Sequence, residues 1–163
     1  MVYEEELLKL SERLGDACRR QTATVTTAES CTGGGVAAAI TDIAGSSDYF
    51  ETGYITYANV SKMRLLKVSK SMLEGYGAVS QETVEAMVKG ACLESGADIG
   101  VAVSGIAGPD GGSDEKPVGT VWFAWGDASR QHAERHVFEG DRLQVRHQAV
   151  RVALEGLIDW LEK

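Results

Sequence analysis

The chain has 163 residues with 16 basic and 24 acidic side chains, so its formal net charge at pH 7 is −8. This acidic balance argues against general nucleic-acid binding, which requires a basic surface. No apolar run approaches the roughly 18–20 residues that cross a bilayer. The acidic N-terminus also lacks the basic and apolar segments of a signal peptide. We therefore expect a cytoplasmic protein that binds neither nucleic acid nor membrane.

Hydrophobic residues make up 44% of the chain and charged residues 25%, which is ordinary for a globular domain. The length fits a single domain spanning residues 1–163, which would bury roughly 70% of the surface of the unfolded chain. The three cysteines, Cys18, Cys31 and Cys92, include no CxxC pair, so no disulfide framework is expected.

Hydrophobic periodicity, β-branched runs and capping residues predict a series of helices and strands. In chain order they are a helix through Leu7, Leu10, Leu14 and Cys18, a strand at 22–28, a helix at 36–40, a strand at 51–58, a helix at 62–68 capped by Asn59, a helix opened by Ser80, strands at 99–103, 118–125 and 133–138, and a last helix capped by Asp141 with Gln144. A short turn at 126–127 would make the last two strands antiparallel. This order predicts an α/β protein, a three-layer α/β/α sandwich with a mixed β-sheet.

The strongest local feature is the run Glu29-Ser30-Cys31-Thr32-Gly33-Gly34, which lies between a predicted strand and a predicted helix. A hydroxyl at that point, here Ser30, lies at the carboxyl edge of the sheet, where ligands bind in open α/β folds. Backbone amides at Thr32, Gly33 and Gly34 would point out of the helix N-terminus and hold an anion or a developing oxyanion. A glycine-rich turn that only tightens helix packing explains the pattern equally well, because it is neither a Walker loop nor GxGxxG.

A serine nucleophile needs a base. The three histidines, His132, His136 and His147, show no spacing typical of a triad or a zinc site. Lys62 is the better candidate, because the first turn of a helix disfavours a cation and lowers its pKa. Tyr57 is placed to relay a proton or to orient the amine. A solvated surface lysine is the plainer interpretation of Lys62 from spacing alone.

Cys31 is a rival nucleophile, because a helix N-terminus depresses the pKa of a thiol. The alternative, a small buried residue that packs under the turn, agrees better with Ser30 holding the turn position. Ser104 and Gly105 begin a long glycine-rich segment after the strand at 99–103, so Ser104 would face Ser30 across a shared cleft.

Arg142 and Arg146 are four residues apart on the last predicted helix and therefore share a face. Either guanidinium can bind a phosphate through two parallel hydrogen bonds. The sequence leaves open which of the two does so, and an exposed pair beside acidic residues is the commoner interpretation.

Five segments together resemble a known family: TAESCTGG at 27–34, GYITYANVSK at 53–62, GAVS at 77–80, SGIAGPDGGSDEKPVGTVWFA at 104–124 and GDRLQVR at 140–146. They are similar to the C-terminal domain of the competence/damage-inducible protein CinA, over essentially the whole chain. Ser104 stands where many relatives have threonine, so the hydroxyl is kept. The nucleotide-pyrophosphatase domain of larger family members has no counterpart in this sequence.

The resemblance is closest to stand-alone family members, which hydrolyse the carboxamide of nicotinamide mononucleotide and return the pyridine nucleotide to NAD synthesis. It implies that Ser30 is the catalytic serine, Lys62 its base and Tyr57 an assisting residue. It also implies a binding role for Ser104, Gly105 and Arg146, and no metal or cofactor. A non-catalytic module that senses a nucleotide is the alternative. The sequence does not fix the number of subunits, although a homodimer is the commonest assembly.

Overall fold

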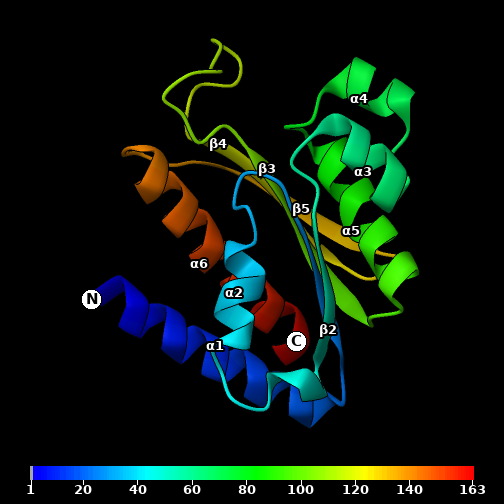
Figure 1. Cartoon of the computed structure of the whole chain (residues 1–163), viewed down its shortest axis with the longest axis vertical. Helices are drawn as coiled ribbons and strands as arrows, with labels where there is room; N and C mark the ends of the chain where they lie inside the picture. The colour runs from blue at the N-terminus through cyan, green and yellow to red at the C-terminus, as the bar shows by residue number, and fades with distance from the viewer. Residues whose placement is uncertain (1) are drawn as a thin grey trace.

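The computed structural model describes residues 2–163 and confirms the three-layer α/β/α architecture with a mixed sheet (Figure 1). The elements are α1 (Val2–Gln21), β1 (Val25–Glu29), α2 (Gly35–Thr41), the 3₁₀ turn η1 (Ser46–Asp48), β2 (Phe50–Ile55), α3 (Asn59–Leu66), α4 (Lys70–Tyr76), α5 (Gln81–Ser95), β3 (Ile99–Gly105), β4 (Thr120–Gly126), β5 (Gln131–Val137) and α6 (Arg142–Glu162). No helix within residues 2–163 combines the length and the apolar character needed to cross a membrane.

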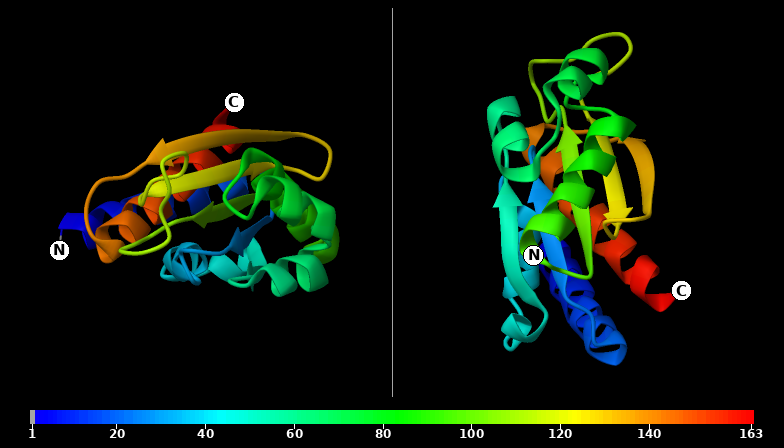
Figure 2. Two further views of the ribbon diagram at one scale, coloured as in Figure 1. Left: turned by 90° about the horizontal axis from the view of Figure 1, so that it is seen from above. Right: turned by 90° about the vertical axis from the view of Figure 1, so that its right-hand side faces the viewer.

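The sheet has five strands in the order β2-β1-β3-β4-β5. The strands β2, β1 and β3 are parallel, whereas β4 and β5 are antiparallel to their neighbours, so the predicted antiparallel pair is confirmed. Helices α1, α2 and α6 cover one face and α3, α4 and α5 the other, as Figures 1 and 2 show. The carboxyl ends of β1, β2 and β3 therefore meet at one edge, between the two helical layers.

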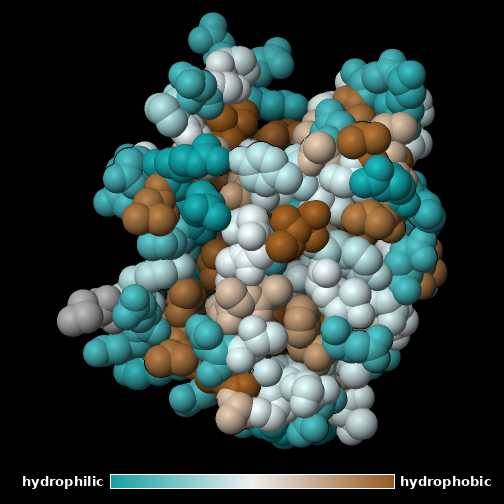
Figure 3. Space-filling model, viewed as in Figure 1, coloured by the Kyte–Doolittle hydropathy of each residue, from teal (hydrophilic) through white to brown (hydrophobic). Residues whose placement is uncertain are grey.

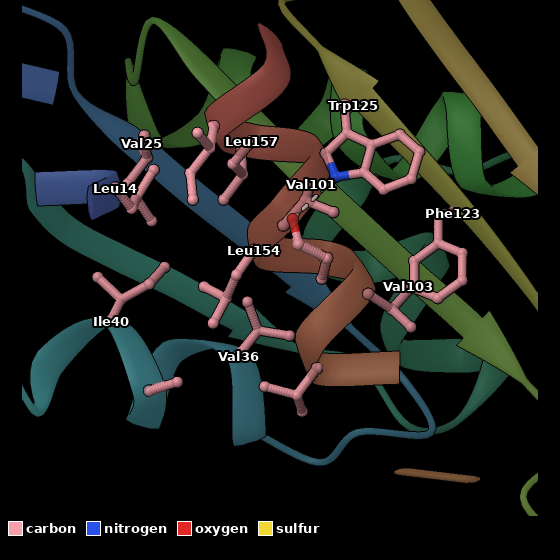
Figure 4. Close-up of a cluster of buried hydrophobic side chains, with 14 of the residues drawn as sticks. Leu14, Val25, Val36, Ile40, Val101, Val103, Phe123, Trp125, Leu154 and Leu157 are labelled. Carbon is pink, nitrogen blue, oxygen red and sulfur yellow. Dashed lines mark hydrogen bonds between the residues drawn. The ribbon is translucent and has the colours of Figure 1, made fainter. Parts of the chain in front are cut away.

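Two apolar clusters hold these layers together, one on each face of the sheet. Val101 and Val103 of β3 belong to the first cluster, with Leu154 of α6, and Ala102 between them belongs to the second (Figure 4). Successive side chains of a strand point to opposite faces. Burial on both faces thus explains why the sequence at 99–103 is continuously apolar.

Two of the three predicted N-caps of helices are confirmed, and the third is wrong. Ser80 accepts a hydrogen bond from the Thr83 amide, and Asp141 forms a full capping box with Gln144, as predicted. The prediction that Asn59 caps α3 is wrong, because Ala58 is the extended residue before the helix and Asn59 is already helical. The helix α4 was not predicted at all.

Candidate functional site

Ser30 directly follows β1 and continues its pairing with β3, since its amide donates to the Val103 carbonyl at 2.9 Å. After this bond the chain turns sharply into α2, and residues 30–34 are named here the Ser30 turn. Gly33 and Gly34 have φ of +58° and +102°, values that side-chain-bearing residues rarely adopt. The glycines thus let the chain reverse within a few residues and leave the Ser30 hydroxyl at the sheet edge.

Lys62 lies in α3, the helix that follows the neighbouring strand β2, and its side chain reaches Ser30. The parallel pairing of β1 with β2 continues past the end of β2, because the Thr56 amide donates to the carbonyl of Glu29, the last residue of β1, at 2.8 Å. This pairing brings the start of α3 over the Ser30 turn. The Lys62 Nζ lies 3.0 Å from the Ser30 Oγ, 2.8 Å from the Thr56 carbonyl oxygen and 3.3 Å from the Tyr57 carbonyl oxygen.

Lys62 is only 1% exposed, and no carboxylate of residues 2–163 lies within ion-pair distance of its amine. Burial disfavours the ammonium form and lowers the pKa of Lys62 to about 8. Its three hydrogen-bond partners are neutral acceptors, so they orient the amine without supplying a counter-charge. Such a lysine accepts a proton at mildly alkaline pH, as a general base must.

Cys31, which follows Ser30 in the chain, lies in an environment that is unsuited to a nucleophile. The side chain is buried, and burial raises the pKa of its thiol to about 12. A helix N-terminus lowers a thiol pKa only when its amides face the sulfur. Here the amides of α2 face a different group.

That group is Glu29, the last residue of β1, whose carboxylate is fully buried. It accepts hydrogen bonds from the Thr32 hydroxyl at 2.6 Å and from the amides of Gly34, Val36 and Ala37 at 3.2, 2.9 and 3.0 Å. The Gly33 amide donates instead to the Ser30 carbonyl. The Gly33 and Gly34 amides, which the sequence suggested as oxyanion donors, are therefore engaged within the protein.

A cleft of about 300 Å³ opens over Ser30 and Lys62. Figure 3 shows the surface hollowed between the segment 106–119, named here the cleft loop, and the lobe formed by α3 and α4. Its lining also includes Tyr57, Asn59, Ala78, Val79, Ser104, Gly105, Asp110 and Arg142. Ser104 and Ser30 thus line one cleft, as expected. A larger groove between β5 and α6 contains no serine–lysine pair, so we place the candidate chemistry in this smaller cleft.

The two arginines of α6 have different surroundings. Arg142 lines the cleft and donates to the Gly108 carbonyl at 2.7 Å and to the Tyr57 hydroxyl at 2.8 Å. Arg146 lines a separate pocket rather than the cleft, and it donates to the carbonyls of Cys31 and Thr32, at 3.0 and 3.2 Å. Arg142 is therefore the guanidinium that a ligand in the cleft can meet.

Tyr57 lies at the mouth of the cleft with its side chain 59% exposed. Among residues 2–163, its phenol contacts Arg142 rather than Lys62 or Ser30, and the backbone carbonyl makes the Lys62 contact. The histidines lie elsewhere. His132 and His136 flank Glu134 on β5, and His147 stacks on Tyr3.

The sequence alone assigned no role to Glu29. Glu29 carried a signal, because it stands between a β-branched strand and the start of a helix, where a carboxylate can accept helix amides. The contribution of Asn59, Ala78 and Val79 to the lining had no comparable signal, since it depends on how α3 and α5 pack.

The chain is similar to known proteins over nearly its whole length. The CinA C-terminal domain family matches residues 7–161. A nicotinamide-nucleotide amidohydrolase PncC from Pseudomonas putida is 59% identical over 94% of this chain and 96% of its own length. The protein of the same name from Escherichia coli K12 is 53% identical over 94% of both chains. A crystal structure of a CinA superfamily protein from Klebsiella pneumoniae superposes with a TM-score of 0.92, at 40% identity over 96% of this chain and 98% of the other.

Proposed function

The chain belongs to the CinA C-terminal domain family, and from this premise we propose that it hydrolyses the carboxamide of nicotinamide mononucleotide. The products are nicotinic acid mononucleotide and ammonia. Relatives of 53–59% identity over nearly the whole chain carry the name nicotinamide-nucleotide amidohydrolase. The observation that carries the proposal is the 3.0 Å contact between the buried Lys62 amine and the Ser30 hydroxyl.

In the proposed mechanism Lys62 acts in its neutral form. Two of the three acceptors around its Nζ are the backbone carbonyls of Thr56 and Tyr57. A neutral amine has two N–H groups, and both can donate hydrogen bonds to these carbonyls. The lone pair of the nitrogen then faces Ser30. The geometry therefore supports Lys62 as the group that takes the hydroxyl proton while Oγ attacks the carboxamide carbon. Tyr57 assists by orienting the amine through its carbonyl.

The tetrahedral intermediate carries negative charge on the former carbonyl oxygen. With the Gly33 and Gly34 amides engaged, we assign its stabilisation to the Cys31 and Thr32 amides, which donate to no carbonyl or carboxylate of the described residues. Cys31 lines the cleft beside Ser30. The amide that follows a nucleophilic serine often serves in this way, and one such donor typically contributes about 3–4 kcal/mol.

Collapse of the intermediate breaks the C–N bond, and protonated Lys62 gives its proton to the departing ammonia. The pyridinium carbonyl remains as an ester on Ser30. Water attacks this ester with Lys62 again as base, which releases the carboxylic acid and restores the hydroxyl. The cationic ring withdraws electrons from the carboxamide and makes it more electrophilic.

The same cleft supports binding of the rest of the nucleotide. We propose that Arg142 binds the phosphate, because its guanidinium lines the cleft and already bridges Tyr57 and the cleft loop. Such a remote contact binds substrate and transition state alike, so it lowers KM. The reaction would return a pyridine nucleotide to NAD synthesis. The single domain, the cytoplasmic location and the homodimer stay predictions from the sequence.

The direct test is ammonia release from nicotinamide mononucleotide in the presence of a chelator, with the wild type, Ser30→Ala and Ser129→Ala side by side. Ser129 is an exposed serine in the turn between β4 and β5, at the opposite end of the sheet, and serves as the matched control. We expect turnover by the wild type and the control but not by Ser30→Ala. Binding of the nucleotide without turnover by the wild type would favour the sensing module instead.

A further inference from the structure

We propose that Glu29 and Arg146 are positioning residues, a buried carboxylate and a guanidinium that hold the Ser30 turn from opposite sides. The inference rests on the proposed amidase function and adds to it. It gives a role to two charged groups that the mechanism above does not use, and it assigns Arg146 to the turn rather than to the substrate.

Glu29 holds the donor side of the turn. Its two oxygens accept one hydroxyl and three amides, which span Thr32 to Ala37. No salt bridge to Glu29 occurs among residues 2–163, so its charge is balanced by these donors and by the N-terminal end of α2. A fully buried carboxylate is costly to place unless its hydrogen bonds are satisfied, which makes this set of contacts difficult to rearrange.

Arg146 holds the acceptor side. Its Nε and Nη2 donate to two successive carbonyls, those of Cys31 and Thr32. In a trans peptide the N–H and C=O groups point in opposite directions. Fixing the Cys31 carbonyl on Arg146 therefore directs the Thr32 amide away from the guanidinium, and fixing the Thr32 carbonyl directs the Gly33 amide toward its partner, the Ser30 carbonyl.

The turn needs such restraint because of its glycines. Gly33 and Gly34 have many accessible backbone conformations, so they restrain the neighbouring peptides of the turn less than residues with side chains would. A flipped Cys31–Thr32 peptide would place the Cys31 carbonyl oxygen where the Thr32 amide must donate to the developing oxyanion. Arg146 opposes this flip, and its positive charge on the carbonyl end also polarises the Thr32 peptide so that its amide is a stronger donor.

The inference separates Arg146 from its neighbour one helical turn away. A residue that acts through the turn affects the chemical step, so its loss lowers kcat with little change in KM. The loss is equal for nicotinamide mononucleotide and for its nucleoside without the phosphate. A phosphate-binding arginine does the opposite, because its loss raises KM for the mononucleotide alone.

The experiment compares Arg146→Ala, Arg146→Lys and Glu29→Gln with the wild type on both substrates. Arg151→Lys is the matched control, because Arg151 is on the same helix and pairs with Glu6, away from the cleft. We expect kcat to fall about 10- to 100-fold in Arg146→Ala, since a misdirected donor costs no more than a deleted one. Arg146→Lys should recover part of the loss. Glu29→Gln should also lower kcat. The side-chain NH₂ group of glutamine would replace a carboxylate oxygen that accepts hydrogen bonds, and it would face a backbone amide donor.

Amide hydrogen exchange of residues 31–36 gives a second readout that does not depend on turnover. We expect faster exchange there in the Arg146 and Glu29 variants, with the rest of the chain protected as in the wild type. A raised KM for the mononucleotide with unchanged kcat in Arg146→Ala would overturn the inference. Unchanged amide exchange of the turn in the Arg146 and Glu29 variants would also overturn it. If the wild type is inactive but its turn still exchanges faster in the variants, the result counts against the proposed function and supports Glu29 and Arg146 as the residues that hold the turn.

Discussion

Two glycine-rich segments end at the same edge of the sheet, and they are held in very different ways. The Ser30 turn lies between a buried carboxylate and a guanidinium, which together make six hydrogen bonds to residues 31–37. The cleft loop is exposed from 109 to 115. A few hydrogen bonds join the cleft loop to the rest of the fold, such as the one that the Arg142 side chain donates to the Gly108 carbonyl.

The difference matches what the proposed mechanism requires of each segment. Nucleophilic attack requires the hydroxyl, the base and the oxyanion donors to keep their places within a fraction of an ångström. Substrate must also enter and leave, and an open loop at the mouth of the cleft permits this. We therefore expect substitutions in the Ser30 turn to affect kcat and those around the cleft loop to affect KM. The predictions below test that division.

The largest effect is expected for Ser30→Ala. Removal of the nucleophile should lower kcat by at least about 10⁴-fold, while binding of the nucleotide persists because the rest of the cleft is intact. The variant removes one atom from a side chain that is nearly buried, so circular dichroism and thermal unfolding should resemble those of the wild type. Calorimetric binding together with ammonia release measures both quantities. Turnover above about one hundredth of the wild-type rate would show that another group attacks.

Lys62 comes next. Lys62→Met fills a similar volume without a base and should lower kcat by about 10³-fold. In the wild type, protonated Lys62 cannot accept the serine proton, so kcat should be lost as the pH falls below about 8 and reach a plateau above it. The rate–pH profile of the wild type gives this midpoint. A flat profile between pH 6 and 9, or a residual Lys62→Met rate with the same midpoint, would argue against a lysine base.

The site and its surroundings also show which features can be predicted from the sequence. Structural positions that follow from local pattern are predicted correctly: the apolar run at 99–103 is the buried β3, and Ser30 directly follows a strand and begins a glycine turn. Lys62 was also selected as a base from its place near a helix start. Its contact with Ser30 depends on β1 and β2 being parallel neighbours, and the order of strands is not contained in the pattern of either strand.

The features that the sequence did not predict are decided by packing or by backbone conformation. The α4 helix has seven residues, and only Leu73 among them is buried, so it has no apolar stripe to detect. Ala58 rather than Asn59 precedes α3 because Ala58 has the extended backbone that a cap requires. A spacing of four residues places Arg142 and Arg146 on one face of α6. Which of them reaches the cleft depends on where the Ser30 turn packs against that helix.

Arg142 tests the binding side of the comparison. Arg142→Ala should raise KM for nicotinamide mononucleotide about 10- to 100-fold, since a charge-assisted hydrogen bond is worth about 1.5–3 kcal/mol. The value of kcat should change little, because the turn and Lys62 are untouched. KM for the nucleoside without phosphate should be nearly unaffected. Steady-state kinetics on both substrates provide the measurement, and an equal loss on the two would remove the phosphate assignment.

The smallest effect is expected for Lys116→Ala in the cleft loop. The Lys116 amine donates to the Tyr76 carbonyl at 3.0 Å and so ties the exposed loop to the end of α4 across the cleft mouth. An exposed hydrogen bond of this kind contributes little, typically below about 1 kcal/mol. We expect KM to rise by no more than about threefold and kcat to stay within the error of the assay. Lys70→Ala is a suitable control, since Lys70 is an exposed lysine at the start of α4 that pairs with Glu74. If kcat instead falls markedly in Lys116→Ala alone, then loop position contributes to the chemical step, and the division between a held turn that performs chemistry and an open loop that admits substrate does not hold.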